Sequence, residues 1–125
     1  MALLIGVWID QKKAVLAVAG GGVTTVHSRV EAHPHWAGAQ DGGGEKKFEA
    51  RHAEQLNRFF DEVIAHLGAA QSLFLFGPGE AKFGLRKRLE HVKALDHVTV
   101  RIEPSDHITD AQIAAKVREL ADTAA

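Results

Sequence analysis

Four acidic residues stand where strands or helices are predicted to begin or end. Asp10 and Glu80 each follow an apolar run, and Asp106 and Asp110 precede or begin the last predicted helix. Three carboxylates at the ends of neighbouring strands could hold one or two Mg²⁺ ions for phosphodiester hydrolysis. The same acids also suit turns and the first turns of helices. A magnesium-dependent nuclease is therefore one alternative.

Histidines flank a glycine-rich stretch in the middle of the chain. His33 and His35 precede it and His52 follows it. A His-x-His pair with a third ligand can bind zinc or nickel. The other interpretation is a polar loop with surface imidazoles, since eight histidines in one chain come close by chance. We predict neither a metal nor another cofactor.

Basic residues gather in two segments: Lys46, Lys47 and Arg51 follow the glycine-rich stretch, and a longer cluster lies further along the chain. The segment from Glu80 to Lys93 carries five positive and two negative side chains, a local net charge of +3. Such clusters can hold a nucleic-acid backbone, although a solvated helix face is the alternative. The residues predicted to contact phosphate are Lys46, Lys47, Arg51, Lys82, Arg86 and Arg88.

Residues 38–47 read GAQDGGGEKK, with four glycines in ten positions. Glycine gives up more backbone freedom on ordering than any other residue, so this composition predicts a loop, with a helix beginning near Phe48. A loop of this length inside a compact domain is usually functional or disordered. The functional positions predicted in it are Gly38, Ala39, Gln40, Gly42, Gly43 and Gly44.

Composition limits the class of protein. A chain of 125 residues with 46% hydrophobic and 25% charged residues fits one globular domain over residues 1–125. The absence of cysteine excludes disulfides and thiolate chemistry. The apolar first ten residues are too short to span a bilayer and lack a signal-peptide pattern. We expect a cytoplasmic protein without a membrane partner.

The apolar pattern predicts strands over residues 3–9, 14–19, 23–31, 72–76 and 98–103, and helices over 48–67, 81–92 and from 110 onward. Thr109 and Gln112 form a predicted capping box, with Ile108 and Ile113 as a hydrophobic staple. The order β-β-β-α-β-α-β-α predicts an α/β fold: a five-stranded mixed sheet flanked by helices, with the first strand central. Residues 23–31 form the predicted edge strand, through which a homodimer is a further alternative.

Two segments carry a resemblance to a known family. Residues 7–18, VWIDQKKAVLAV, are similar to the opening hairpin of the central domain of class I release factors of eukaryotes and archaea. Residues 74–82, FLFGPGEAK, are similar to the Gly-Pro-Gly strand-to-helix turn of the related protein Pelota. The element order resembles this domain over essentially the whole chain, a translational-machinery-component topology that is similar to that of ribonuclease-H-like nucleases.

The resemblance implies a role in translation. The glycine-rich loop falls where release factors carry Gly-Gly-Gln, whose glutamine enters the peptidyl-transferase centre. Here the nearest match is Gly38-Ala39-Gln40, which makes Gln40 the candidate catalytic residue. The Cβ of Ala39 restricts positive φ and close approach to RNA, and Pelota lacks the glutamine motif. The resemblance therefore implies a non-catalytic domain associated with the ribosome or ribosomal RNA.

Overall fold

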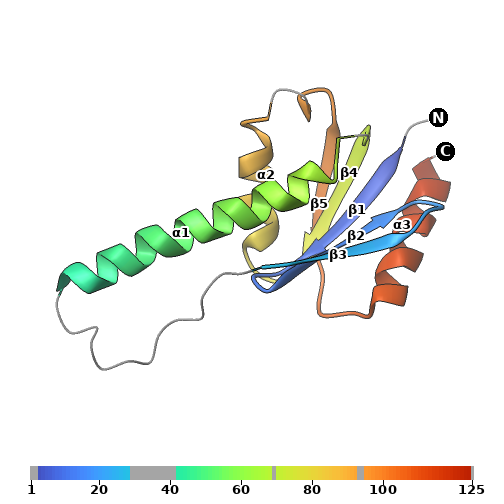
Figure 1. Cartoon of the computed structure of the whole chain (residues 1–125). Coiled ribbons are helices and arrows are strands. Elements are labelled where there is room, and N and C mark those ends of the chain that lie inside the picture. The colour runs from blue at the N-terminus through green and yellow to red at the C-terminus, as the bar shows by residue number, and fades with distance from the viewer. Residues whose placement is uncertain (1–2, 29–41, 69, 93–94, 125) are drawn as a thin grey trace.

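The computed structural model describes residues 3–28, 42–68, 70–92 and 95–124. They form one five-stranded sheet and three helices (Figure 1). The elements are β1 (Leu4–Ile9), β2 (Lys13–Val18), β3 (Val23–His27), α1 (Gly42–Ala65), β4 (Ser72–Gly77), α2 (Ala81–Leu89), β5 (Thr99–Pro104) and α3 (Asp110–Ala124).

The strand order is β3-β2-β1-β4-β5, with β1 at the centre. β1 pairs antiparallel with β2, and β2 pairs antiparallel with β3. On the other side, β1, β4 and β5 run parallel. The structure therefore confirms the predicted α/β fold, its mixed sheet and its central first strand.

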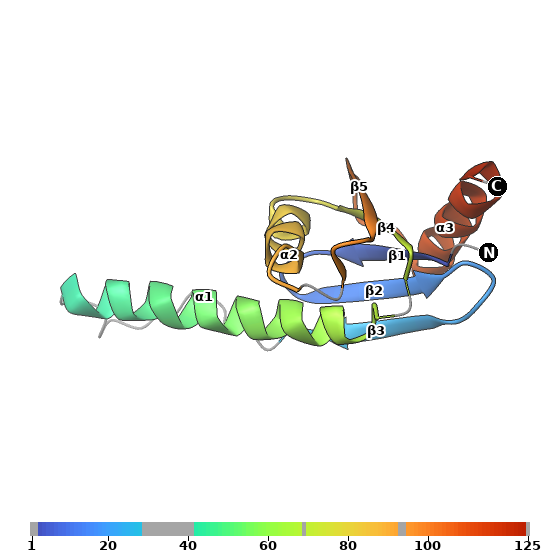
Figure 2. The ribbon, with the colours of Figure 1, turned by 90° about the horizontal axis from the view of Figure 1, so that it is seen from above.

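A separate core covers each face of the sheet. Alternate residues of β1 supply both, because successive side chains in a strand point to opposite faces. Val7 and Ile9 pack in the core with α1 and α2, whereas Trp8 packs in the core with α3. Figure 2 shows α1 and α3 on opposite sides of the sheet.

The start of α3 has the predicted cap. The backbone N–H of Thr109 donates to Oε1 of Gln112 at 2.8 Å, and the backbone N–H of Gln112 donates to Oγ1 of Thr109 at 3.1 Å. Ile108 and Ile113 both pack in the core on this face, as the staple requires. Further along, α3 lies close to β1 because Gly6 has no side chain; a Cβ there would overlap Val117.

Helix α1 differs from the prediction. It begins at Gly42, so the glycines at 42–44 and both Lys46 and Lys47 belong to the helix rather than to a loop. Each glycine lowers helix stability by only about 1 kcal/mol relative to alanine, and residues 45–58 contain no proline and many good helix formers. The predicted loop was therefore too long, because the glycine content was given too much weight.

The 24 residues of α1 span about 36 Å. The core residues of this helix are Leu56, Phe59, Phe60, Val63 and Ile64. Its N-terminal half extends away from the sheet, as Figures 1 and 2 both show. The helix therefore has two parts. Residues 42–55 form a projecting arm, and residues 56–65 anchor the helix to the sheet.

Candidate functional site at the carboxyl edge of the sheet

The three parallel strands end at the same edge of the sheet. β1 ends at Ile9, β4 at Gly77 and β5 at Pro104, and Gly77 lies directly opposite Pro104 in the register. In open α/β sheets, ligands bind outside the carboxyl ends of the strands. The segments that follow β1, β4 and β5 are therefore the first place to look for a site.

Asp10 organises the turn after β1. Its Oδ1 accepts the backbone N–H groups of Lys12 at 2.7 Å and Lys13 at 2.8 Å. Its own N–H donates to the carbonyl of Lys13 at 3.0 Å. These bonds give Asp10 a local structural role in the turn, which is the alternative to metal binding.

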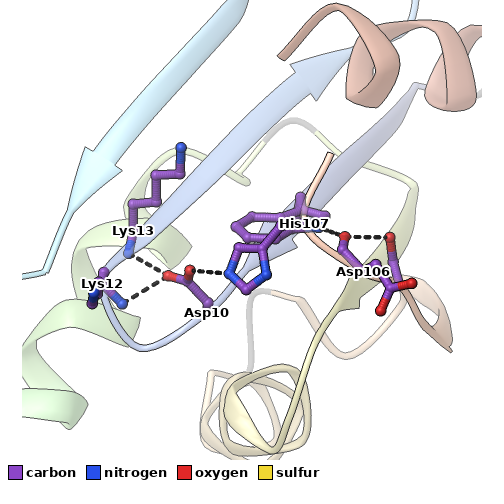
Figure 3. A network of polar contacts seen from close by, with 7 residues as sticks. Asp10, Lys12, Lys13, Asp106 and His107 are labelled. Atoms are coloured by element: carbon purple, nitrogen blue, oxygen red, sulfur yellow. Dashed lines mark hydrogen bonds and ion pairs between the residues drawn. The ribbon is translucent and has the colours of Figure 1, made fainter. Parts of the chain in front are cut away.

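The second carboxylate oxygen of Asp10 faces another part of the chain. Oδ2 lies 3.4 Å from Nε2 of His107, a contact that is an ion pair when the imidazole is protonated (Figure 3). The Asp10 side chain is only 15% exposed, whereas that of His107 is 73% exposed. Asp10 thus contacts one nitrogen of an imidazole that is largely exposed to solvent.

Trp8 lies beneath this pair. Its side chain is buried, and its indole N–H donates to the carbonyl of Asp106 at 3.1 Å. The rings of Trp8 and His107 meet edge to face, with centroids 5.3 Å apart. The Nζ of Lys13 lies 5.9 Å from the Trp8 ring centroid. An imidazole and an ammonium group therefore lie near one buried indole, and the imidazole links it to the Asp10 carboxylate.

The turn after β4 supports the same edge. Gly77 has φ of +143° and Gly79 has φ of +66°, conformations that L side chains rarely adopt. A Cβ on Gly77 would overlap the carbonyl oxygen of Ile9, so the strand can approach β1 this closely only with glycine. The Gly77 carbonyl accepts the N–H of Ser105 at 3.2 Å, which positions the segment containing Asp106 and His107.

The four acids of the nuclease hypothesis do not form a metal centre. In the part of the chain that the structure describes, no group of three or more His, Cys, Asp or Glu residues could hold a metal ion. Asp10, Glu80, Asp106 and Asp110 all belong to that part. What the edge does offer is a contact between the Asp10 carboxylate and the His107 imidazole.

Sequence reasoning missed Trp8 and His107. Trp8 reads as an ordinary apolar strand residue, and His107 is one of eight histidines. Their contact joins positions about a hundred residues apart, so no local pattern could reveal it. The only clue in the sequence was that Trp8 stands near Asp10 and His107 stands next to Asp106, two acids of the predicted magnesium site.

Lys82 is not where the predicted phosphate contact requires it. The residue is only 4% exposed, its Nζ donates to the carbonyl of Gly79 at 2.5 Å, and it lies 4.7 Å from the Phe83 ring centroid. From its position in the first turn of α2, the Lys82 side chain reaches back to the Gly-Pro-Gly turn. Lys82 therefore has a structural position here and is not part of an exposed basic surface.

Arg88 is exposed in part but already paired. Its Nε and a terminal nitrogen donate to the two carboxylate oxygens of Asp61 at 2.8 and 2.9 Å, joining α2 to α1. This hydrogen bonding to Arg88 lowers the pKa of Asp61 and raises that of the guanidinium. Beside the pair lies a groove of about 290 Å³ lined by Asn57, Phe60, Gly84, Lys87, Arg88 and His91.

The remaining predicted residues are spread out. Arg51 is exposed on the projecting arm of α1, and Arg86 is exposed in the last turn of α2. Lys46 and Lys47 belong to the arm. Gly38, Ala39, Gln40 and the histidines at 33 and 35 lie outside the described residues. The structure thus divides the predicted basic residues between α1 and α2.

The sequence matches no protein-family model, and no curated protein matches it significantly. Within the described ranges, no helix is both long and apolar enough to cross a membrane. The family resemblance therefore rests on the two quoted motifs and the order of elements.

Proposed function

We propose that this protein is a ribosome- or RNA-associated domain similar to the central domain of release factors and Pelota, and that it acts by binding rather than by catalysis. The mixed sheet and the β-β-β-α-β-α-β-α order support the proposal. The observation that carries it is the projecting arm of α1, residues 42–55.

Among the described side chains of the arm, those of residues 50–55, none belongs to the hydrophobic core, although His52 and Gln55 are half-buried. Leu56 is the first described side chain of α1 that packs in the core, while Arg51, Ala53 and Glu54 are exposed. Roughly 20 Å of helix therefore extends beyond the core. An isolated helix of this length is marginally stable in water, so contact with a partner explains the arm better than packing within the chain does.

The arm offers individual cations to an RNA partner, although Glu45, Glu49 and Glu54 balance them to a net charge of zero. Lys46, Lys47 and Arg51 belong to it, and Gln40 stands two residues before its first residue. Arg86 and Lys87 in the last turn of α2 provide a second group of cations. The overall net charge of −1 means that any attraction to phosphate must come from these local groups.

Co-sedimentation with ribosomes tests the proposal. We expect the wild-type protein in ribosomal fractions at low salt, with retention falling steeply as salt rises. Arg51→Gln should weaken retention and reduce the salt dependence by about one ion. Glu54→Gln, an equally small change on the same arm, is the matched control and should bind at least as well as wild type. A wild-type protein absent from ribosomal fractions at low salt contradicts the proposal.

A peptide-release assay separates binding from catalysis. Because the motif reads Gly-Ala-Gln, we expect no release above background from wild type and no change in Gln40→Ala. Release that depends on Gln40 would show that the domain is an enzyme and would overturn the non-catalytic part of the proposal.

A further inference from the structure

The two edges of the sheet are not alike. β5 forms one edge and carries Arg101 and Glu103, whose charged groups lie 3.4 Å apart, before it ends at Pro104. Charges and proline are the usual means by which proteins prevent edge strands from pairing. β3 forms the other edge and reads VTTVH, with no acidic or basic residue except a histidine and no proline.

The hydrogen-bond pattern shows which backbone groups of β3 point outward. At one end of the β2–β3 pair, the N–H of Val18 donates to the carbonyl of Gly22; at the other, the N–H of Ser28 donates to the carbonyl of Lys12. Bonded and non-bonded pairs alternate in an antiparallel ladder. Given the register, Val23, Thr25 and His27 occupy the non-bonded positions. Their N–H and C=O groups therefore point away from β2.

These three residues lie on a strand that is held in place but open to solvent. Val26 is buried in the core with α1 and fixes β3 to the domain. Val23, Thr25 and His27 are exposed, and Val23 is one of two large hydrophobic side chains with such exposure in the described residues, at 42%. The outer side of β3 is therefore a preformed template for another strand.

We propose that β3 pairs antiparallel with β3 of a second copy of this chain, about a two-fold axis at Thr25. In this register Thr25 opposes the partner's Thr25, and Val23 opposes the partner's His27. All three outward positions face outward positions of the other strand, so each opposed pair exchanges two backbone hydrogen bonds. The two five-stranded sheets become one continuous sheet.

The second copy fits this edge better than an unrelated peptide. The strand is complementary to a second copy of itself, because Val23, Thr25 and His27 of each copy supply all the backbone donors and acceptors that join the two strands. His27 faces a valine rather than another histidine, so protonation brings no like charges into opposition. β3 also has no charged residue that would select an oppositely charged partner. This inference does not depend on RNA binding, and a dimer can form whether or not ribosome association is found.

A lysine substitution tests the interface. Thr25→Lys places two ammonium groups opposite each other and should raise the dimer dissociation constant at least about tenfold. Thr99→Lys makes the same change at an exposed position of the other edge strand and should leave it unchanged. Sedimentation equilibrium over a concentration series measures both, and thermal unfolding by circular dichroism shows that each variant folds. A wild-type chain that is monomeric at every concentration overturns the proposal.

Disulfide cross-linking tests the register. The chain has no cysteine, so each variant below carries a single thiol. In the proposed register two Thr25 residues have Cα atoms about 5.5 Å apart, within disulfide range, whereas two Thr24 residues are diagonal neighbours about 7–8 Å apart. Under mild oxidation Thr25→Cys should cross-link at least about tenfold faster than Thr24→Cys or Thr99→Cys. Equal rates for the three variants would exclude this pairing.

Discussion

The indole N–H of Trp8 donates a hydrogen bond of 3.1 Å to the backbone carbonyl of Asp106, across 98 positions of sequence. The bond links the central strand to the segment that leads into α3. The same indole contacts His107 and has Lys13 nearby. The carboxyl edge of the sheet is thus assembled on one buried ring.

Replacing Trp8 should therefore destabilise the domain. Trp8→Phe removes buried ring volume and leaves the Asp106 carbonyl without its indole donor, and we expect it to lower the free energy of unfolding by about 1–3 kcal/mol. His107→Ala removes an exposed ring and should lower it by less than about 1 kcal/mol. Urea unfolding measures both. A larger loss for His107→Ala would show that the imidazole, not the indole, organises this edge.

The two glycines with positive φ in the strand-to-helix turn should differ in their tolerance of a side chain. Gly77→Ala meets the Ile9 carbonyl at a φ of +143°, so we expect a loss of about 3 kcal/mol or more, or failure to fold. Gly79→Ala has open space and only the cost of positive φ, about 1–2 kcal/mol. Thermal unfolding of the two variants compares them directly, and equal losses would contradict the close approach of β4 to β1.

The Asp61–Arg88 pair should make stability depend on pH in acid. Its hydrogen bonds lower the pKa of Asp61 below the usual 3.8. The contribution is therefore fully present above about pH 4 and is lost as the pH falls through the lowered value. Because both side chains are substantially exposed, solvent screening keeps this contribution small.

Urea unfolding of Asp61→Asn between neutral pH and about pH 2 checks the sign. The variant should be less stable than wild type at neutral pH, and the difference should shrink below pH 3.8. Glu62→Gln, the adjacent exposed position, is the control and should show no such convergence. A difference between wild type and Asp61→Asn that grows in acid would contradict the prediction.

Lys82 and Arg86 should separate stability from RNA binding. Lys82→Met removes a buried ammonium group that donates to Gly79, and we expect about 1–3 kcal/mol less stability with ribosome retention unchanged. Arg86→Met removes an exposed cation, so retention should weaken while stability changes by less than about 0.5 kcal/mol. Co-sedimentation and urea unfolding of both variants provide the comparison. Weaker ribosome retention of a folded Lys82→Met variant would show that Lys82 contacts RNA after all.

Much of the fold followed from local patterns. The apolar runs of β1 and β4, the alternation around Val26 and the Thr109–Gln112 cap each depend on residues close together in the chain, so their spacing was informative. The beginning of α1 was wrong for a related reason: glycine composition is a local signal, but its effect on helix stability is small enough for the neighbouring residues to outweigh it.

The candidate sites were harder to predict because charge alone does not determine position. Lys82 and Arg86 lie one turn apart on α2, yet one is buried against the Gly-Pro-Gly turn and the other is exposed. Because residues four apart lie on the same face of a helix, their difference comes from their place along its axis: Lys82 stands in the first turn, within reach of the Gly79 carbonyl, and Arg86 stands in the last turn. The pairing of Arg88 with Asp61 likewise depends on how α1 packs against α2.

By itself the sequence determined the element order and the central place of β1, because hydrophobic periodicity acts over a few residues. Only the tertiary structure decided that Asp10 would meet His107 over the Trp8 ring, that Lys82 would be buried, and that α1 would extend beyond the core. Those outcomes depend on the register of parallel strands and the packing of helices, which join residues far apart in the chain.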